Sequence, residues 1–434
     1  MKRTGVAGAP TKWAAHVRQI GPGLFAAMTL LGSGGMIDMA VSGANYGYAL
    51  LWGLALAQAS NFFFTFMMSK YQLLNEQGLT IMQGFAKLGK LFPVAAGLGL
   101  LLGIFAYGAF YLPAAGAALA HLVGSDAEWA PFIGSVATVC LCVLMLRAKK
   151  LYKAFENVSR LVTLLLVGTF LFTAISQWPS LIALVNGFLF SIPADEGLFG
   201  SFLVVVALTG VAGATPAAVI YNYAIYEKGW RGPRYRAVQV LDLLVSIVAI
   251  FVIELSIWIV AAETAYGPGI KIGSLEDLSR LMELAVGIVG PPMLWLAVFF
   301  ASFTSIIGTV YLFSRVVTDA AQSAFPRSRR HGDIDNHPIT RWLTVTGLLL
   351  PLLFAAPWAP NVVVLAIVAV TIPLIAMPFM LFGTIRLTGS TRFMPAKFVS
   401  KWQSALLVLM MVWVLVSLAG AAHGLIGTVN ALTG

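Results

Sequence analysis

Charged residues are scarce in this chain. Only 10% of its 434 residues are Asp, Glu, Lys or Arg, and 59% are hydrophobic, whereas soluble globular proteins carry roughly 25% charged residues. A soluble fold could not hide so much apolar surface, so the composition predicts a membrane protein. The apolar runs extend over about 20 residues or more, the length that a helix needs to cross a bilayer. They lack the short apolar–polar alternation of membrane β-barrel strands.

Reactive and metal-ligating groups are also rare. The two cysteines, Cys140 and Cys142, lie two positions apart in one apolar run, so on a helix they face different directions and predict packing rather than a disulfide or a metal pair. The sequence shows no nucleophile–base set and no metal-ligand motif, so neither an enzyme nor a cofactor is expected. The net charge of +10 is not gathered on a soluble basic face, so nucleic-acid binding is not expected either.

Eleven apolar runs predict an all-α membrane protein with about eleven transmembrane helices. The runs cover residues 21–44, 47–69, 93–122, 130–146, 155–176, 199–225, 239–262, 289–314, 342–358, 361–385 and 403–425. Lys and Arg clusters follow the even-numbered runs, and the intervening segments are acidic or mixed. By the positive-inside rule, this alternation places the N-terminal tail, residues 1–18, in the cytoplasm and the C-terminus outside. We therefore predict a multi-pass protein of a bacterial inner membrane.

Two of the predicted spans carry helix-breaking residues at their centres. The first contains Gly32-Ser33-Gly34-Gly35, and glycine disfavours a helix by about 1 kcal/mol relative to alanine. The sixth contains residues 210–217, Gly-Val-Ala-Gly-Ala-Thr-Pro-Ala, whose proline removes a backbone donor but suits the first turn of a new helix. Paired interruptions in matching spans point to the binding site of a transporter. Close helix packing by small residues is the alternative explanation.

The matching positions of the two breaks predict two inverted repeats within a single transporter domain, residues 1–434. Spans one to five, residues 19–176, would form the first repeat, and spans six to ten, residues 199–385, the second. The last run, residues 403–425, would be an additional helix. A monomer is expected.

Several motifs resemble the Nramp (natural resistance-associated macrophage protein) family of transporters. They are Gly21-Pro22-Gly23, residues 43–52 (Gly-Ala-Asn-Tyr-Gly-Tyr-Ala-Leu-Leu-Trp), residues 213–216, and the prolines and flanking apolar residues of 371–382. The resemblance covers nearly the whole chain. It implies a LeuT-type fold with broken helices one and six, secondary transport by alternating access, and a divalent metal as the substrate.

The chain departs from this family at the metal-binding positions. The family carries Asp-Pro-Gly-Asn where this chain has residues 32–35, and Met-Pro-His where it has Thr215-Pro216-Ala217. A further family histidine corresponds to Asn222, and a glutamine of span ten corresponds to Thr371. Without carboxylate or soft sulfur ligands, a divalent ion has little compensation for its lost water.

The altered residues predict a different substrate. Glycine exposes backbone N–H groups, which form anion-binding nests, and the two half-helices direct the positive ends of their dipoles inward. We therefore expect a secondary transporter for a small anion such as bicarbonate or a short carboxylate. A divalent metal carrier (Mn²⁺ or Mg²⁺) using Asp38, a carrier of a small organic solute, and a channel or sensor without turnover remain open. The predicted substrate-binding residues are Gly32, Ser33, Gly34, Gly35, Ala212, Gly213, Ala214, Thr215 and Thr371.

Ionisable residues inside the spans mark possible coupling positions, because a charge at the centre of a membrane helix costs about 2.5–3.5 kcal/mol on insertion scales. Asp38 could bind a coupling cation or proton, or cap a half-helix. Glu254 of the seventh span and Asn222 of the sixth are the other candidates for coupling or symport, whereas Asp242 is expected to be interfacial. The acidic residues that the family ties to proton movement in the third span correspond to Gly108 and Tyr111, which favours uncoupled or differently coupled flux.

Overall fold

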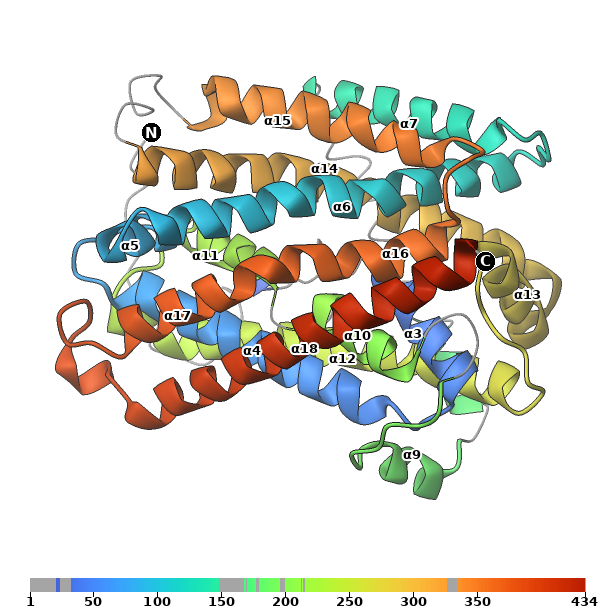
Figure 1. Cartoon of the computed structure of the whole chain (residues 1–434), viewed down its shortest axis with the longest axis horizontal. Coiled ribbons are helices and arrows are strands. Elements are labelled where there is room, and N and C mark those ends of the chain that lie inside the picture. Colours follow the sequence, from blue (N-terminus) through green and yellow to red (C-terminus); the bar gives the residue numbers. More distant parts are fainter. Residues whose placement is uncertain are drawn as a thin grey trace.

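The computed structural model describes residues 21–23, 33–147, 168, 170–176, 179–195, 200–211, 213, 215–325 and 334–433. Within these ranges every regular element is a helix (Figure 1), which confirms the predicted all-α class. Eight helical stretches are long and apolar enough to cross a membrane. The other three predicted spans are the two with central breaks and the run 155–176, most of which lies outside the described residues.

The described helices follow the predicted spans closely. In the first half of the chain they are α3 (Ser33–Tyr46), α4 (Leu51–Leu74), α5 (Ile81–Leu88), α6 (Leu91–Leu122), α7 (Ala130–Arg147), α9 (Leu181–Gly187), α10 (Ser201–Val211), η1 (Pro216–Ala218) and α11 (Val219–Glu227). In the second half they are η2 (Pro233–Tyr235), α12 (Arg236–Ala261), η3 (Ala262–Tyr266), α13 (Leu275–Val286), η4 (Gly287–Val289), α14 (Gly290–Ala324), η6 (Ile334–Asn336), α15 (Pro338–Leu349), η7 (Leu350–Ala355), α16 (Val362–Thr371), η8 (Ile372–Ala376), α17 (Met377–Thr388), η9 (Ala396–Phe398) and α18 (Lys401–Thr433).

The long helices α6 and α14 pack along each other through the middle of the bundle (Figure 1). The 32 residues of α6 give a length of about 48 Å, which is more than the hydrocarbon core requires. Small residues let its neighbours come close: a Cβ atom on Gly116 would lie 2.1 Å from the carbonyl oxygen of Pro131 in α7. These two helices form a wall, and α3 contacts both of them while η1 contacts α6.

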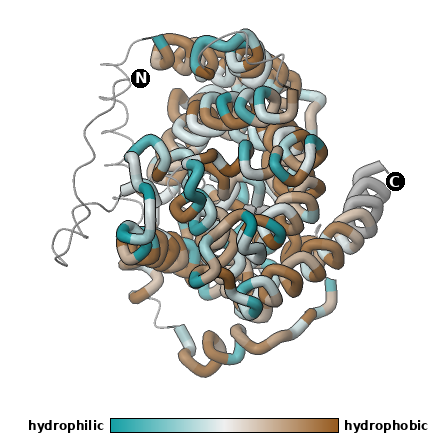
Figure 2. Tube along the Cα trace, turned by 90° about the vertical axis from the view of Figure 1, so that its left-hand side faces the viewer, coloured by the Kyte–Doolittle hydropathy of each residue, from teal (hydrophilic) through white to brown (hydrophobic). Residues whose placement is uncertain are grey.

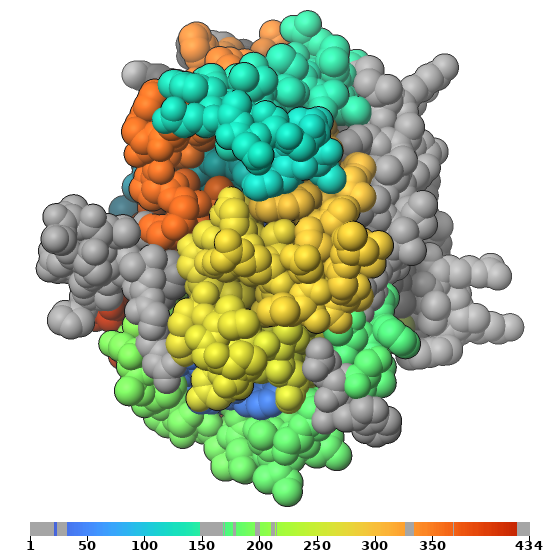
Figure 3. All heavy atoms as spheres, turned by 90° about the vertical axis from the view of Figure 1, so that its right-hand side faces the viewer, coloured from blue at the N-terminus to red at the C-terminus, as the bar shows by residue number. Residues whose placement is uncertain are grey.

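Short amphipathic helices lie at the two ends of the bundle. At the predicted inner end, α5 starts with a capping box in which Thr80 and Gln83 satisfy each other's backbone N–H groups. Figure 2 looks onto this end of the bundle, where hydrophilic residues appear in teal. At the opposite end, α13 starts with the corresponding pair of Ser274 and Asp277. The segment containing η3 and α13, in yellow, extends across this end in Figure 3.

Two polar side chains near the starts or ends of their helices are buried within the protein. Asp242, expected to be interfacial, is fully buried near the start of α12. Its carboxylate accepts hydrogen bonds from the backbone N–H groups of Gly21 and Gly23, both at 2.8 Å, and it also bonds the hydroxyl of Tyr221. Lys70 is buried near the end of α4 and donates to the side-chain oxygen of Gln403.

Candidate functional site

The helix of the sixth span is interrupted where the sequence predicts. Helix α10 ends at Val211, and η1 begins only at Pro216. Between them Thr215 is extended, with φ −130° and ψ 162°, so its backbone leaves the helical path. Pro216 occupies the first turn of the new helix, where its missing N–H costs nothing. Gly213 is buried in the break, whereas Ala212 and Ala214 lie outside the described residues.

In the first span, α3 begins at Ser33, near the middle of the predicted run. Residues 24–32 lie outside the described part, and Gly32 is among them. Ser33, Gly34 and Gly35 are all buried in the first turn of α3. A Cβ atom on Gly34 would lie 2.7 Å from the nearest ring carbon of Phe110, so this glycine permits close contact between α3 and α6.

Hydroxyl groups from the central helices meet the two half-helices. The hydroxyl of Ser302, in α14, donates to that of Ser33 at 2.7 Å, and both residues are buried. The hydroxyl of Tyr107, in α6, shares a hydrogen bond with Thr215. Helix α3 of the first span and the break of the sixth span are thus linked through hydroxyls to the wall formed by α6 and α14.

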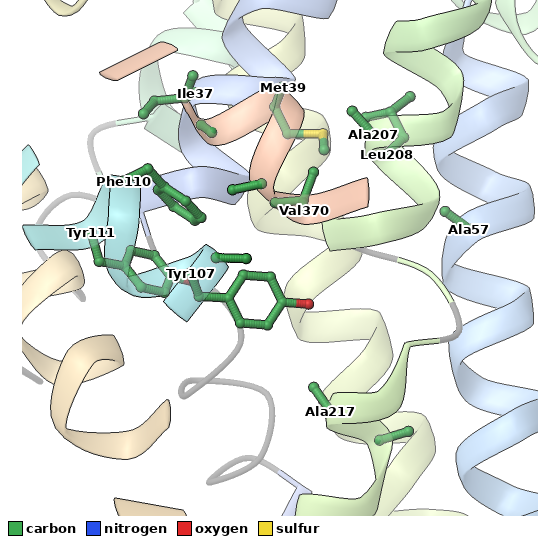
Figure 4. Close-up of a cluster of buried hydrophobic side chains, with 14 of the residues drawn as sticks. Ile37, Met39, Ala57, Tyr107, Phe110, Tyr111, Ala207, Leu208, Ala217 and Val370 are labelled. Atoms are coloured by element: carbon green, nitrogen blue, oxygen red, sulfur yellow. The ribbon is translucent and has the colours of Figure 1, made fainter. Parts of the chain in front are cut away.

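Aromatic rings of α6 fill the space beside these hydroxyls (Figure 4). The rings of Phe110 and Tyr111 are 4.2 Å apart between centroids, and Tyr107 stands edge-on to Phe110. Ala217 of η1 and Val370 of α16 lie across from them (Figure 4). Tyr107 brings a hydroxyl group into this otherwise apolar cluster (Figure 4).

The remaining predicted site residues lie around this centre. Thr371 is buried at the end of α16, where the helix tightens into η8. Asn222 is buried in α11 and donates to the carbonyl of Ala218 at 3.3 Å. Its side-chain oxygen has no hydrogen-bond partner, so it has an unused acceptor beside the second break.

Two buried acidic residues form a second group, between α3, α4 and α12. Asp38 and Glu254 are each 2% exposed, and they come from α3 and α12, which pack against each other. Gln58 of α4 donates to Glu254 at 2.5 Å. Both carboxyl oxygens of Asp38 lack a hydrogen-bond partner, so the alternative that Asp38 caps a half-helix is wrong.

Polar contacts join the helices at the predicted outer end of the first span. The indole N–H of Trp258 donates to the carbonyl of Gly47 at 2.7 Å, and the hydroxyl of Tyr48 donates to Glu263 at 2.6 Å. Asn45 accepts from the backbone N–H of Ile272 at 3.0 Å. The end of α3 is therefore attached both to α12 and to the segment that leads to α13.

A second set of contacts joins the helices at the predicted inner end. Asp319 of α14 accepts from the hydroxyls of Tyr223 in α11 and of Thr80. One turn earlier in α14, Arg315 forms ion pairs with Glu227 of α11 and with Asp335, both at 2.7 Å. The half-helix after the second break is therefore tied to the central wall at this end.

Some site residues were not predicted from the sequence. Ser302, Ser305, Tyr107, Phe110 and Gln58 come from spans that carry no helix break. Polar residues within apolar runs, such as Gln58 and the segment 302–305 (Ser-Phe-Thr-Ser), are the signal that could have found them. The aromatic residues of α6 give no such signal, because rings in membrane helices usually pack.

The donor set of the centre suits binding rather than chemistry. Among the residues that the structure describes, no group of three or more His, Cys, Asp or Glu could hold a metal ion. The groups that meet the breaks are hydroxyls, aromatic rings and backbone.

Comparison with known proteins supports a membrane transport fold. Residues 23–422 match the family model described as natural resistance-associated macrophage protein-like. No curated protein matches the chain.

Solved structures share the architecture at low sequence identity. A mutant of the manganese transporter of Eremococcus coleocola has a TM-score of 0.73 and 16% identity, over 95% of this chain and 87% of that one. The same transporter in complex with an aromatic bis-isothiourea substituted compound has a TM-score of 0.74 and 16% identity, over 97% and 90%. A nucleobase-cation-symport-1 family transporter, closed with bromovinylhydantoin bound, has a TM-score of 0.53 and 14% identity, over 98% and 94%.

Proposed function

Since the chain belongs to the Nramp family of secondary transporters, we propose that it moves a small solute other than a divalent metal, and that this solute is a small anion such as bicarbonate or a short carboxylate. Alternating access would expose the site between α3 and η1 to each side in turn. The fold of the manganese transporter supports this mode of transport.

One observation carries the choice of substrate. The described residues at the two breaks offer hydroxyls and backbone groups, chiefly Ser33 and Thr215, where family members that bind metal carry an acid, an amide and a thioether. Mg²⁺ and Mn²⁺ prefer carboxylate, carbonyl and water oxygens. Hydroxyl donors and the positive ends of two half-helices suit a negatively charged oxygen better than a 2+ ion.

The surroundings limit the size of the solute. Phe110, Tyr107 and Tyr111 occupy one side of the centre, and Phe110 contacts the backbone of Gly34. These rings would cover the apolar part of a short carboxylate while its oxygens meet the hydroxyls. We therefore propose that Gly213, Thr215 and Thr371 contact the solute together with residues 33–35.

A divalent metal is the second candidate, because two buried acids, Asp38 in α3 and Glu254 in the adjacent α12, lie on helices beside the site. Metal transport would then use this pair instead of the positions at the breaks. The two candidates make opposite predictions in proteoliposomes.

The test is uptake into liposomes that contain the purified protein. Bicarbonate, formate or acetate entry would be followed by internal pH, and Mn²⁺ entry by quenching of an internal dye. We expect saturable anion uptake that Thr215→Val reduces about 5- to 15-fold, because the substitution removes a hydroxyl hydrogen bond worth about 1–1.5 kcal/mol. Thr384→Val is the matched control, since Thr384 is equally buried but its hydroxyl bonds only its own helix. Saturable Mn²⁺ uptake without anion uptake would refute the proposed substrate.

A further inference from the structure

We propose that Asp38, Glu254 and Gln58 form the binding site for a monovalent cation, Na⁺ or a proton, whose movement is coupled to that of the substrate. This inference rests on the proposed function, because coupling requires a transported solute. The site itself is separate from the uncharged centre at the two breaks.

Three helices bring these residues together inside the membrane. Asp38 lies five residues after the start of α3, about 7.5 Å along the helix axis. Glu254 comes from α12 and Gln58 from α4, and the Gln58 amide N–H donates to Glu254 at 2.5 Å. The three side chains are each at least 97% buried, so bulk solvent does not reach them.

Three oxygens of this group have no hydrogen-bond partner: both carboxyl oxygens of Asp38 and the amide oxygen of Gln58. The Gln58 oxygen is free because its nitrogen faces Glu254. Buried polar atoms are almost always paired, and leaving one unpaired is costly. Unpaired oxygens on two helices that both pack against α12 are explained by an occupant to which they act as ligands.

The chemistry of the group selects a cation with a single charge. Two neighbouring carboxyl groups in a low-dielectric interior disfavour double ionisation, so one bound proton or Na⁺ relieves their repulsion. Only oxygen ligands are offered, as a hard cation prefers. The hydrogen bond that Glu254 receives comes from the neutral amide of Gln58, so it brings no counter-charge to the pair.

Two other titratable residues on neighbouring elements, Tyr111 and Glu263, already have hydrogen-bond partners. Tyr111 of α6 interacts electrostatically with Asp38, and its hydroxyl bonds Ser305. Glu263, on η3, is engaged with Tyr48. Glu254 and Asp38 are therefore the groups left to bind the cation.

This position explains how cation and anion could move together. Asp38 lies in α3, as Ser33 does, and it interacts with Tyr111. Tyr111 packs against Phe110 in the aromatic cluster of α6. With the pair unoccupied, its negative charge would repel an anion at the breaks. With the cation bound, the repulsion is removed, so each ligand favours binding of the other.

The test measures cation binding without any transport. The unfolding midpoint of the purified full chain is recorded in Na⁺, in K⁺ and in choline, from mildly acidic to mildly alkaline pH, for the wild type, Asp38→Asn, Glu254→Gln and Gln58→Leu. A cation bound only by the folded state raises the midpoint. Asp319→Asn is the control, because Asp319 is a buried acid whose carboxylate already has hydroxyl partners; it should keep the cation response of the wild type.

If Na⁺ is the occupant, Na⁺ raises the wild-type midpoint by several degrees relative to K⁺ and choline, and the variants lose the rise. If a proton is the occupant, Na⁺ has no effect, the midpoint falls as pH rises, and the Asp38 and Glu254 variants flatten that dependence. A response to Na⁺ and pH that is the same in the wild type and in the variants would overturn the proposal.

If the variants fail to fold, chemical labelling of the wild-type protein still tests whether the two acids bind a cation. Dicyclohexylcarbodiimide modifies protonated carboxyl groups in apolar surroundings, and mass spectrometry locates the adduct. An adduct on Asp38 or Glu254 that declines at higher pH or in Na⁺ supports the site, and no adduct on either at any pH overturns it. If a cation stabilises the wild type but the protein takes up no anion, the proposed function is refuted and the cation site is not. If the protein takes up anions but the variants keep the cation response of the wild type, the cation site is refuted and the proposed function is not.

Discussion

The contact between Gly34 and Phe110 gives the sharpest test of how the first span is held. A Cβ atom on Gly34 would lie 2.7 and 2.8 Å from two ring carbons of Phe110, whereas carbon atoms pack best at about 3.5–4.0 Å. The ring would have to retreat by roughly 1 Å. It has little room, because Phe110 is 1% exposed and packs against Tyr111.

Gly34→Ala should therefore be destabilising. Overpacking of this kind costs about 1–3 kcal/mol. The matched control is Gly53→Ala in α4, a buried helical glycine whose added Cβ would make only ordinary contacts of 3.4–3.5 Å and gain up to about 1 kcal/mol of helix propensity. Gly34→Ala should thus unfold at a lower temperature than Gly53→Ala, and its initial rate of substrate uptake should fall.

A second substitution tests the cause. Phe110→Leu removes the ring that the new methyl group would meet, so the double variant should recover stability relative to the sum of the single changes, with a coupling energy of about 0.5–3 kcal/mol. The assay is thermal unfolding of detergent-purified protein together with uptake in liposomes. Equal stability of Gly34→Ala and Gly53→Ala, or strict additivity with Phe110→Leu, would show that this contact does not position α3.

Three further predictions concern the contacts around the centre. Asp242→Asn should lower the free energy of unfolding by about 1.5–3 kcal/mol, because a carboxylate that accepts two backbone N–H groups is a stronger acceptor than an amide. Thermal unfolding of this variant is compared with that of Asp126→Asn, a change at an exposed residue. Equal unfolding midpoints for the two variants would contradict the prediction. Tyr223→Phe removes a hydroxyl bond to Asp319 and should loosen the inner end, so that a cysteine introduced at Ala217 reacts faster with a thiol reagent in a background without Cys140 and Cys142. An unchanged rate would mean that this bond does not hold the inner end. Trp258→Phe deletes the N–H donor to Gly47 at the outer end and should cost about 1 kcal/mol or slightly more, whereas a neutral result in thermal unfolding would mean that water replaces the bond.

Much of the fold could be predicted from the sequence because membrane spans are local features. A run of apolar residues defines a helix without knowledge of its neighbours, and the observed helices α4, α6, α7, α12 and α14 fall on predicted runs. The break before Pro216 was predicted for the same reason, since glycine and proline act on their own backbone. The position of Asp242 was not predicted, because its burial depends on Gly21 and Gly23, about 220 residues away.

The candidate site could be predicted only in part. Ser33 and Thr215 were found from the breaks, but their partners Ser302 and Tyr107 lie in uninterrupted helices. Asp38 and Glu254 were each identified as ionisable residues within spans. Their proximity, and the free oxygens of Asp38 and Gln58, depend on how α3, α4 and α12 pack.

The sequence by itself determined that the chain lies in a membrane, where its helices run and where the sixth span breaks, because hydrophobicity and backbone preference act within a few residues. The tertiary structure decided which side chains face one another: hydroxyls from α14 and α6 at the breaks, and two acids with a glutamine between three helices. Such encounters join residues more than a hundred positions apart, and they follow from the packing of whole helices rather than from any local pattern.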